Sequence, residues 1–250
     1  MGGIAMKVNI LATGSNCNCV LATYSDGQQV MFDFGKGAYD LCLQQDFRYH
    51  KMVDFSKLDN VLITHSHNDH CGDFEKIATL NFPKSLNVKE FPVLHDVENK
   101  GFVVMNDKVR EGFVYMTDFY DIPSDSFNFL LKLFGFKSWK WMICMELSYC
   151  DWLYEKLPEE MRFGLKRHLS DKKFYHYCNQ FFVVNEALNI ISVHASARQG
   201  EFVLGANKSG DVCQPGWCRE QFWKRFKGKA VRFGEAGGMA SNYYYLEKIV

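Results

Sequence analysis

The stretch Thr64-His65-Ser66-His67-Asn68-Asp69-His70-Cys71-Gly72-Asp73 decides the fold of this 250-residue chain. The apolar run before it, Val61-Leu62-Ile63, predicts a strand over residues 60–64. The pattern after it predicts a helix over residues 71–80. The stretch therefore joins a buried strand to a helix.

The polar side chains of this stretch have the spacing of metal ligands. His65 and His67 are two residues apart, so an extended backbone points both to the same side, where they can share one cation. Asp69 and His70 enter the helix and turn toward a second position nearby. Imidazole and carboxylate ligands together favour zinc, manganese or iron over calcium or magnesium. Four such groups within six residues indicate a metal site and not a plain surface.

The rest of the chain alternates short apolar runs with turn residues, which predicts more strands than helices. Ser25-Asp26-Gly27 is a hairpin turn signal, and Ser170 is a predicted N-cap. Helices are expected at residues 151–157 and 171–179. Further strands are expected at residues 7–13, 19–24, 29–33, 102–105, 112–117, 139–147, 189–193 and 230–233. This order favours an α/β layered αββα sandwich over a doubly wound sheet.

Composition indicates a single domain spanning residues 1–250, because 47% of the residues are hydrophobic. Lys plus Arg equals Asp plus Glu at 29 each, so no overall field attracts long polyanions. The nine cysteines are odd in number and scattered, which favours reduced thiols and the cytoplasm. No signal peptide or membrane span is predicted. Cys17 with Cys19, and Cys213 with Cys218, are either a structural zinc site or buried small hydrophobic residues.

The ligand stretch resembles the metallo-β-lactamase superfamily, whose HxHxDH signature is matched by His65, His67, Asp69 and His70. Gly14-Ser15-Asn16 and Phe32-Asp33-Phe34-Gly35 look like the opening hairpin of that family. The resemblance implies an αββα fold, two zinc ions, or manganese or another divalent first-row metal, and hydrolytic activity. It also implies that Asp33 supports the ligand loop without being a ligand.

The resemblance extends to three later motifs that would complete the ligand set. His95 resembles the third imidazole of the first metal, Asp118 the carboxylate that bridges both metals, and His194 the remaining ligand of the second metal. The implied set is His65, His67, Asp69, His70, His95, Asp118 and His194.

Asp69 and the last motif, at His194, favour the phosphodiesterase branch typified by tRNase Z. His168 resembles the non-ligand histidine of that branch, which implies a general acid or a donor to the phosphate. The alternative is a surface residue beside a helix cap. Glu146 would orient His168 or be purely structural, and Asp69 is kept as a catalytic candidate besides its ligand role.

Residues 123–141 are unusually aromatic for a segment between two strands. One interpretation is a helix packed on the core, and the other is a lid or dimer-contact insertion. In the second case the aromatic side chains could also stack on a base.

Size and motif order resemble the compact phage proteins that counter Pycsar defence. This implies a homodimer that hydrolyses 3′,5′-cyclic mononucleotides, in the host cytoplasm if the chain is phage-encoded. The second hypothesis is a 5′ exonuclease or tRNase Z-like nuclease on single-stranded DNA or RNA, which predicts a basic groove. A third is another hydrolase or binding protein of the same fold. The basic candidates, which could equally be a solvated face, are Lys166, Arg167, Lys172, Lys173, Lys224, Arg225, Lys227, Lys229 and Arg232.

Overall fold

The computed structural model describes residues 6–14, 17–43, 53–149, 154, 159, 162, 166–193, 230–233 and 244–246. In these residues the strands form a five-stranded sheet, ordered β11-β1-β2-β3-β4, and a six-stranded sheet, ordered β10-β9-β8-β7-β6-β5. The strands of the first sheet are β1 Lys7–Ala12, β2 Cys19–Thr23, β3 Gln29–Phe32, β4 Leu58–Leu62 and β11 Tyr244–Leu246. Those of the second are β5 Asn87–Val93, β6 Asn99–Asn106, β7 Glu111–Met116, β8 Lys140–Glu146, β9 Asn189–Val193 and β10 Ala230–Phe233.

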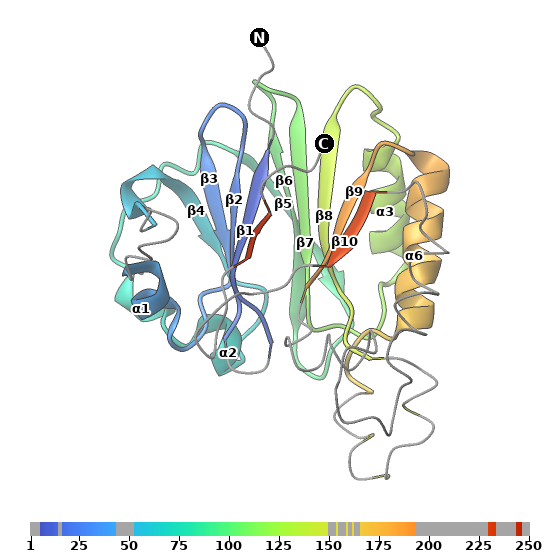
Figure 1. Cartoon of the computed structure of the whole chain (residues 1–250), viewed down its shortest axis with the longest axis horizontal. Helices are drawn as coiled ribbons and strands as arrows, with labels where there is room; N and C mark the ends of the chain where they lie inside the picture. Colours follow the sequence, from blue (N-terminus) through green and yellow to red (C-terminus); the bar gives the residue numbers. More distant parts are fainter. Residues whose placement is uncertain are drawn as a thin grey trace.

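The two sheets face each other across a core of aromatic and branched side chains (Figure 1). The ring of Phe32 in β3 lies 5.0 Å from that of Phe113 and 4.9 Å from that of Tyr115, both in β7. Every residue of β7 is buried, so its alternate side chains, Val114 and Met116, pack on the opposite face of the sheet. The central strand is thus covered on both sides.

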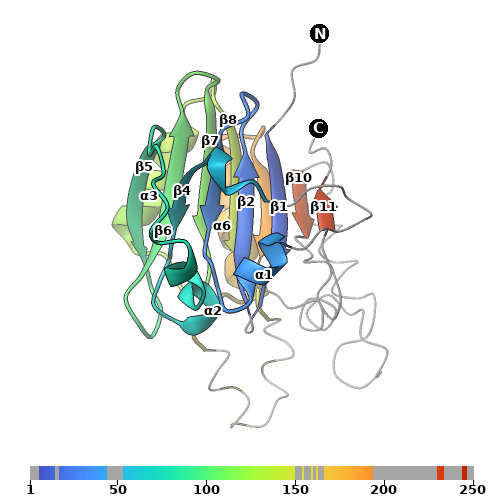
Figure 2. The ribbon, with the colours of Figure 1, turned by 90° about the vertical axis from the view of Figure 1, so that its left-hand side faces the viewer.

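Helices cover the outer faces of the sandwich. The helix α1, Ala38–Leu43, lies on the first sheet, as Figures 1 and 2 show. The helices α3, Ser124–Phe134, and α6, Asp171–Val184, lie on the second sheet. The four layers confirm the predicted αββα sandwich. None of the described helices has the length and apolar character that a bilayer crossing requires.

The aromatic segment at residues 123–141 contains α3, a turn and the first residues of β8. Leu130, Leu133 and Phe134 are buried against the second sheet and α6. The ring of Phe127 lies 5.6 Å from that of Phe181 in α6. The segment therefore packs on the core of its own chain, as the first of the two interpretations expects. A contact with a second copy stays a prediction.

The predicted helix at residues 71–80 is wrong. The helix α2, Asn68–Cys71, lasts one turn, and the 3₁₀ helix η2, Phe74–Lys76, follows it. Between them, the carboxylate of Asp73 accepts hydrogen bonds from the backbone N–H groups of Gly37 and Tyr39. The backbone N–H of Asp73 also donates to the carbonyl of Phe34 at 3.1 Å and not to the residue one turn earlier, so the helical ladder ends here.

The helix predicted at residues 171–179 is confirmed and continues to Val184, and the hydroxyl of Ser170 caps it by accepting from the N–H of Lys173 at 3.4 Å. The hairpin turn at Ser25-Asp26-Gly27 is also confirmed, with Gly27 at a φ of 90°. The prediction missed β5, β11, α1 and the 3₁₀ helix η1, Phe55–Lys57. Most of the helix predicted at residues 151–157 lies outside the described residues.

Candidate metal centre

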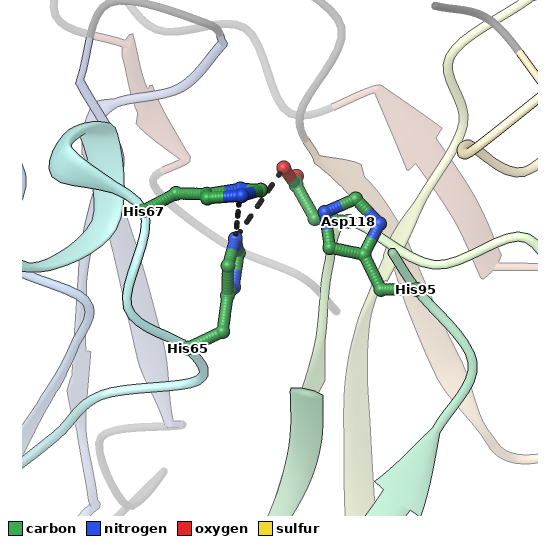
Figure 3. Close-up of side chains that lie close together, drawn as sticks. All are labelled: His65, His67, His95 and Asp118. Carbon is green, nitrogen blue, oxygen red and sulfur yellow. Dashed lines mark hydrogen bonds and ion pairs between the residues drawn. The ribbon is translucent and has the colours of Figure 1, made fainter. Parts of the chain in front are cut away.

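Three imidazoles and one carboxylate meet where strands of both sheets end. The strand β4 ends three residues before the first imidazole and five before the second, and β5 and β7 each end two residues before their ligand candidate. We call these residues the first group: His65, His67, His95 and Asp118. Their donor atoms all lie within 4.8 Å of one another (Figure 3). Nε2 of His65 lies 3.0 Å from Nδ1 of His67 and 3.9 Å from Oδ2 of Asp118.

A second group shares one carboxylate with the first. It consists of Asp69, His70 and Asp118, again with donor atoms within 4.8 Å. Nε2 of His70 lies 3.4 Å from Oδ2 of Asp69 and 3.3 Å from Oδ2 of Asp118. Asp118 has a φ of 49°, a left-handed conformation that non-glycine residues adopt rarely and often at functional sites. The shared carboxylate is therefore placed to face both positions.

The imidazoles are oriented by partners on the nitrogen that faces away from the groups. Nδ1 of His65 lies 3.0 Å from the hydroxyl of Thr64, and Nδ1 of His95 lies 3.2 Å from the carbonyl oxygen of Arg167. Nδ1 of His70 lies 2.8 Å from Oδ2 of Asp33. A proton on each Nδ1 leaves the lone pair of Nε2 toward the site, as a metal-bound histidine requires.

Asp33 supports the ligand stretch from within the core, as the sequence predicts. It is fully buried, and Oδ1 accepts hydrogen bonds from the N–H and the hydroxyl of Thr64, both at 2.9 Å. Oδ2 accepts from the hydroxyl of Tyr115 at 3.0 Å and faces His70. All lone-pair directions of the carboxylate are thus occupied, which fixes the imidazole of His70.

Asn18 is a residue that the sequence analysis missed. Its backbone N–H donates to the carbonyl of Asp69 at 2.7 Å, and its amide nitrogen lies 2.9 Å from Nε2 of His70. Its carbonyl accepts from the N–H of Gly35, where a Cβ would clash with the carbonyl oxygen of Asp69. The small residues around Asn18 were the available signal, but nothing local indicates a partner that lies 51 residues away.

Burial and neighbouring charges move the pKa values of the imidazoles in opposite directions. Burial, with the charge of His70 adding to it, lowers the pKa of His65 to about 4. Burial also lowers the pKa of His95. For His70, burial opposes protonation, but the carboxylates of Asp33, Asp118 and Asp69 outweigh it and hold its pKa well above the ordinary value. His65 and His95 are therefore neutral at neutral pH, as an imidazole must be to bind a metal ion.

The donor set fits divalent metal ions. In a tetrahedral zinc site with bonds of about 2.0–2.1 Å, neighbouring ligand atoms lie about 3.3 Å apart. The 3.0 Å between His65 and His67, and the 3.3 Å between His70 and Asp118, are close to that separation. Nε2 of His95 is buried and makes no hydrogen bond, and Oδ1 of Asp96 lies 2.9 Å from it. A buried ring nitrogen that makes no hydrogen bond fits the role of a metal ligand.

Two sequence predictions about metal ligands concern residues without described structure. His194, Cys213 and Cys218 lie outside the described residues. Cys17 is partly buried and Cys19 fully buried, and in the part of the chain that the structure describes no cysteine belongs to a group of potential ligands. For these two thiols the structure favours small buried side chains.

His168 and Glu146 form a pair beside the first group. Nδ1 of His168 lies 2.8 Å from Oε1 of Glu146, and the His168 ring lies 5.8 Å from that of His95. Glu146 is fully buried at the end of β8, where Oε2 accepts from the N–H of Phe119 at 2.5 Å and Oε1 from the hydroxyl of Ser148. The side chain of His168 is 21% exposed. Glu146 thus holds the ring through Nδ1.

Comparison with known proteins supports this architecture. Residues 12–145 match the sequence model of the metallo-beta-lactamase superfamily. A search of curated proteins found no significant sequence match.

Several solved structures share the fold. The metallo-beta-lactamase fold protein YhfI from Bacillus subtilis is 13% identical, with a TM-score of 0.56 over 96% of this chain and 99% of that one. Yeast PDE1 is 11% identical, with a TM-score of 0.58 over 97% and 100%. The short form of human tRNase Z is 15% identical, with a TM-score of 0.50 over 77% and 93%. At these identities the likeness shows the fold alone.

Proposed function

The chain belongs to the metallo-β-lactamase superfamily, and on that premise we propose that it is a metal-dependent phosphodiesterase that opens the ring of 3′,5′-cyclic mononucleotides. The observation that carries the proposal is the pair of His168 and Glu146 beside the ligand groups. Ester hydrolysis needs a proton for the leaving oxygen, and His168 is a titratable group there that is not itself a proposed ligand. The names of yeast PDE1 and human tRNase Z are consistent with phosphodiester substrates on this fold.

The proposed ligands divide into two positions. His65, His67 and His95 would hold one divalent ion, preferably zinc, Asp69 and His70 would hold the other together with His194, and Asp118 would contact both. Ions bound there would supply positive charge to the phosphate oxygens and lower the pKa of an attacking water.

The chain's own residues then perform three tasks. The ligand groups would hold the metal ions, and through them the phosphate, at the edge of the sandwich. Glu146 accepts a hydrogen bond from Nδ1 of His168, and this bond fixes the tautomer and the direction of the ring. Nε2 of protonated His168 donates a proton to the ribose oxygen that leaves. Since Glu146 is fully buried and carries two other hydrogen bonds, it holds the ring without moving.

The charges beside the site favour a small substrate over a polymer. The guanidinium of Arg167 is paired with Asp96, and the ammonium of Lys173 lies 2.9 Å from Asp121. These two cations are therefore already neutralised. A polymer needs a continuous row of free cations along its backbone, whereas one cyclic phosphate can be neutralised by the metal ions. The basic residues at positions 224, 225, 227 and 229 lie outside the described residues.

The test is a hydrolysis panel on metal-analysed protein. We expect opening of 3′,5′-cyclic mononucleotides, little cleavage of single-stranded DNA or RNA, and loss of activity in His67→Ala. His176→Ala is the matched control, because His176 is an exposed histidine on α6 that belongs to neither group. Cleavage of polymers without ring opening would replace this substrate by the nuclease alternative. If the metal-loaded protein hydrolyses neither cyclic mononucleotides nor polymers, the proposed phosphodiesterase activity is wrong.

The proposal includes a homodimer. Its mass in solution, measured by light scattering, should be twice the 29.0 kDa of the chain. If the active protein has the mass of one chain, the homodimer is wrong and the proposed hydrolase activity is unaffected.

A further inference from the structure

Asp96 and Arg167 form an ion pair across the rim of the site. Asp96 directly follows His95, and Arg167 directly precedes His168. The guanidinium of Arg167 donates to Oδ2 of Asp96, a residue 71 positions away in the chain. The contact therefore joins the segment after β5 to the segment before α6, and both segments carry residues of the proposed site.

Oδ1 of Asp96 lies between two imidazoles of the first group, 2.9 Å from Nε2 of His95 and 3.9 Å from Nε2 of His67. The outward nitrogens of the three imidazoles other than that of His67 face an oxygen of a neighbouring residue. His65 faces the hydroxyl of Thr64, His70 the carboxylate of Asp33, and His95 the carbonyl of Arg167. Nδ1 of His67 faces His65 at 3.0 Å, so its Nε2 points away from the first group, toward Oδ1 of Asp96 at 3.9 Å. At 3.9 Å the contact is an ion pair and not a direct hydrogen bond, but it places a carboxylate on the side of the ring where metal-bound imidazoles usually have an outer partner.

Arg167 holds the first group at two points. Its carbonyl oxygen accepts from Nδ1 of His95 at 3.2 Å, while its side chain holds Asp96. Through Asp96 it also acts on His67. Because the next residue is His168, the same backbone segment fixes the position of the proposed proton donor.

We propose that Asp96 and Arg167 are positioning residues of the first group: Asp96 orients the imidazole of His67, and Arg167 keeps Asp96 in place. The side chains are 29% and 40% exposed, and an ion pair this exposed contributes little to folding. Outer partners of metal ligands have a larger effect on the metal, commonly about 10- to 100-fold in affinity. The pair should therefore matter for metal binding and hardly for stability.

The test measures zinc affinity by competition with a chromophoric chelator in Asp96→Ala, Arg167→Ala and the double variant. Each single substitution should weaken the binding of one zinc ion by about 10- to 100-fold. The double variant should lose no more than the more severe single variant, because both residues act through His67. Arg167→Lys should restore part of the loss, since an ammonium can still hold the carboxylate.

The matched control is the ion pair of Lys100 on β6 and Glu90 on β5, which is 2.9 Å long and similarly exposed, and whose carboxylate belongs to neither group. Glu90→Ala should leave zinc affinity unchanged. Losses that multiply in the double variant would overturn the inference, as would wild-type zinc affinity in both single variants.

The inference rests on the proposed function only in placing a metal at the first group. Zinc competition uses no substrate, so a failed hydrolysis assay would not affect it. Absence of zinc binding by the wild-type protein would overturn the proposed function together with this pair. Unchanged affinity in the variants of a zinc-binding protein would overturn the pair alone.

Discussion

The two ligand groups share Asp118 but differ in how the protein holds them. In the second group, the His70 side chain is completely buried, and its partner Asp33 is completely buried as well, with hydrogen bonds of 2.8 to 3.0 Å. In the first group, the side chain of His67 is 36% exposed and faces a partly exposed carboxylate at 3.9 Å. The side chains of His65 and His95 are also buried, at 0% and 2% exposed, so the contrast is between His70, which is built into the core, and His67, which is held at the rim. Changes at the core should therefore affect folding and metal together, and changes at the rim should affect the metal or the reaction alone.

Asp118→Ala gives the largest expected effect, because it removes the carboxylate that both groups share. The transition state should lose several kcal/mol of charge stabilisation, so activity should fall by about 10³-fold or more. Metal analysis should show loss at both positions. Loss of a single ion with activity retained would show that the carboxylate serves one group only.

Asp33→Ala should separate the core-held group from the rim. It leaves the hydroxyl of Tyr115 and the N–H of Thr64 buried without an acceptor, so denaturant unfolding should show a loss of about 3 kcal/mol. The matched control is Asp40→Asn, at an exposed position on α1, with a loss of well under about 1 kcal/mol. Equal stability of the two variants would contradict the distinction between the groups.

His168→Asn should reduce the reaction without reducing bound metal. General acid catalysis contributes about 10²- to 10⁴-fold, so we expect kcat to fall by at least about 10²-fold. Glu146→Gln should reduce kcat less, because the ring stays in place with poorer orientation. Metal analysis of both variants decides between a proton donor and a structural role: lost metal would show that His168 supports the ligands.

The smallest expected effect is on stability at low pH, from a carboxylate near the rim. Burial raises the pKa of Asp121, but hydrogen bonds from Tyr177 and Lys173 outweigh it, so the folded pKa lies below the ordinary value. The stabilisation is therefore present above the unfolded pKa of about 3.9 and disappears as the pH falls through the folded value. Because the side chain is 40% exposed, we expect about 0.5 kcal/mol at pH 7.

Unfolding of wild type and Asp121→Asn, measured from pH 7 down to pH 3, checks this. The difference in stability between the two proteins should shrink below about pH 4. A difference that grows as the pH falls would have the wrong sign for a carboxylate with a lowered pKa.

The sequence predicts elements whose signals are local. The strands around the ligand stretch and the α6 N-cap at Ser170 were predicted because periodicity and capping act within a few residues. The helix after Cys71 was predicted too long, because Asp73 is held by backbone groups near residues 37–39. The strand β5 was missed because it is an edge strand with exposed polar residues, which weakens alternation.

The sequence by itself predicted the layered fold and the candidate ligands His65, His67, Asp69 and His70, since their spacing defines a local backbone geometry that brings them together. Only the tertiary structure decided that Asp118 faces both groups, that Asp33 and Asn18 hold His70, and that Arg167 holds Asp96. These contacts join residues 37 to 71 positions apart. Such pairings depend on strand register and on how the sheets stack, and local periodicity carries no information about either.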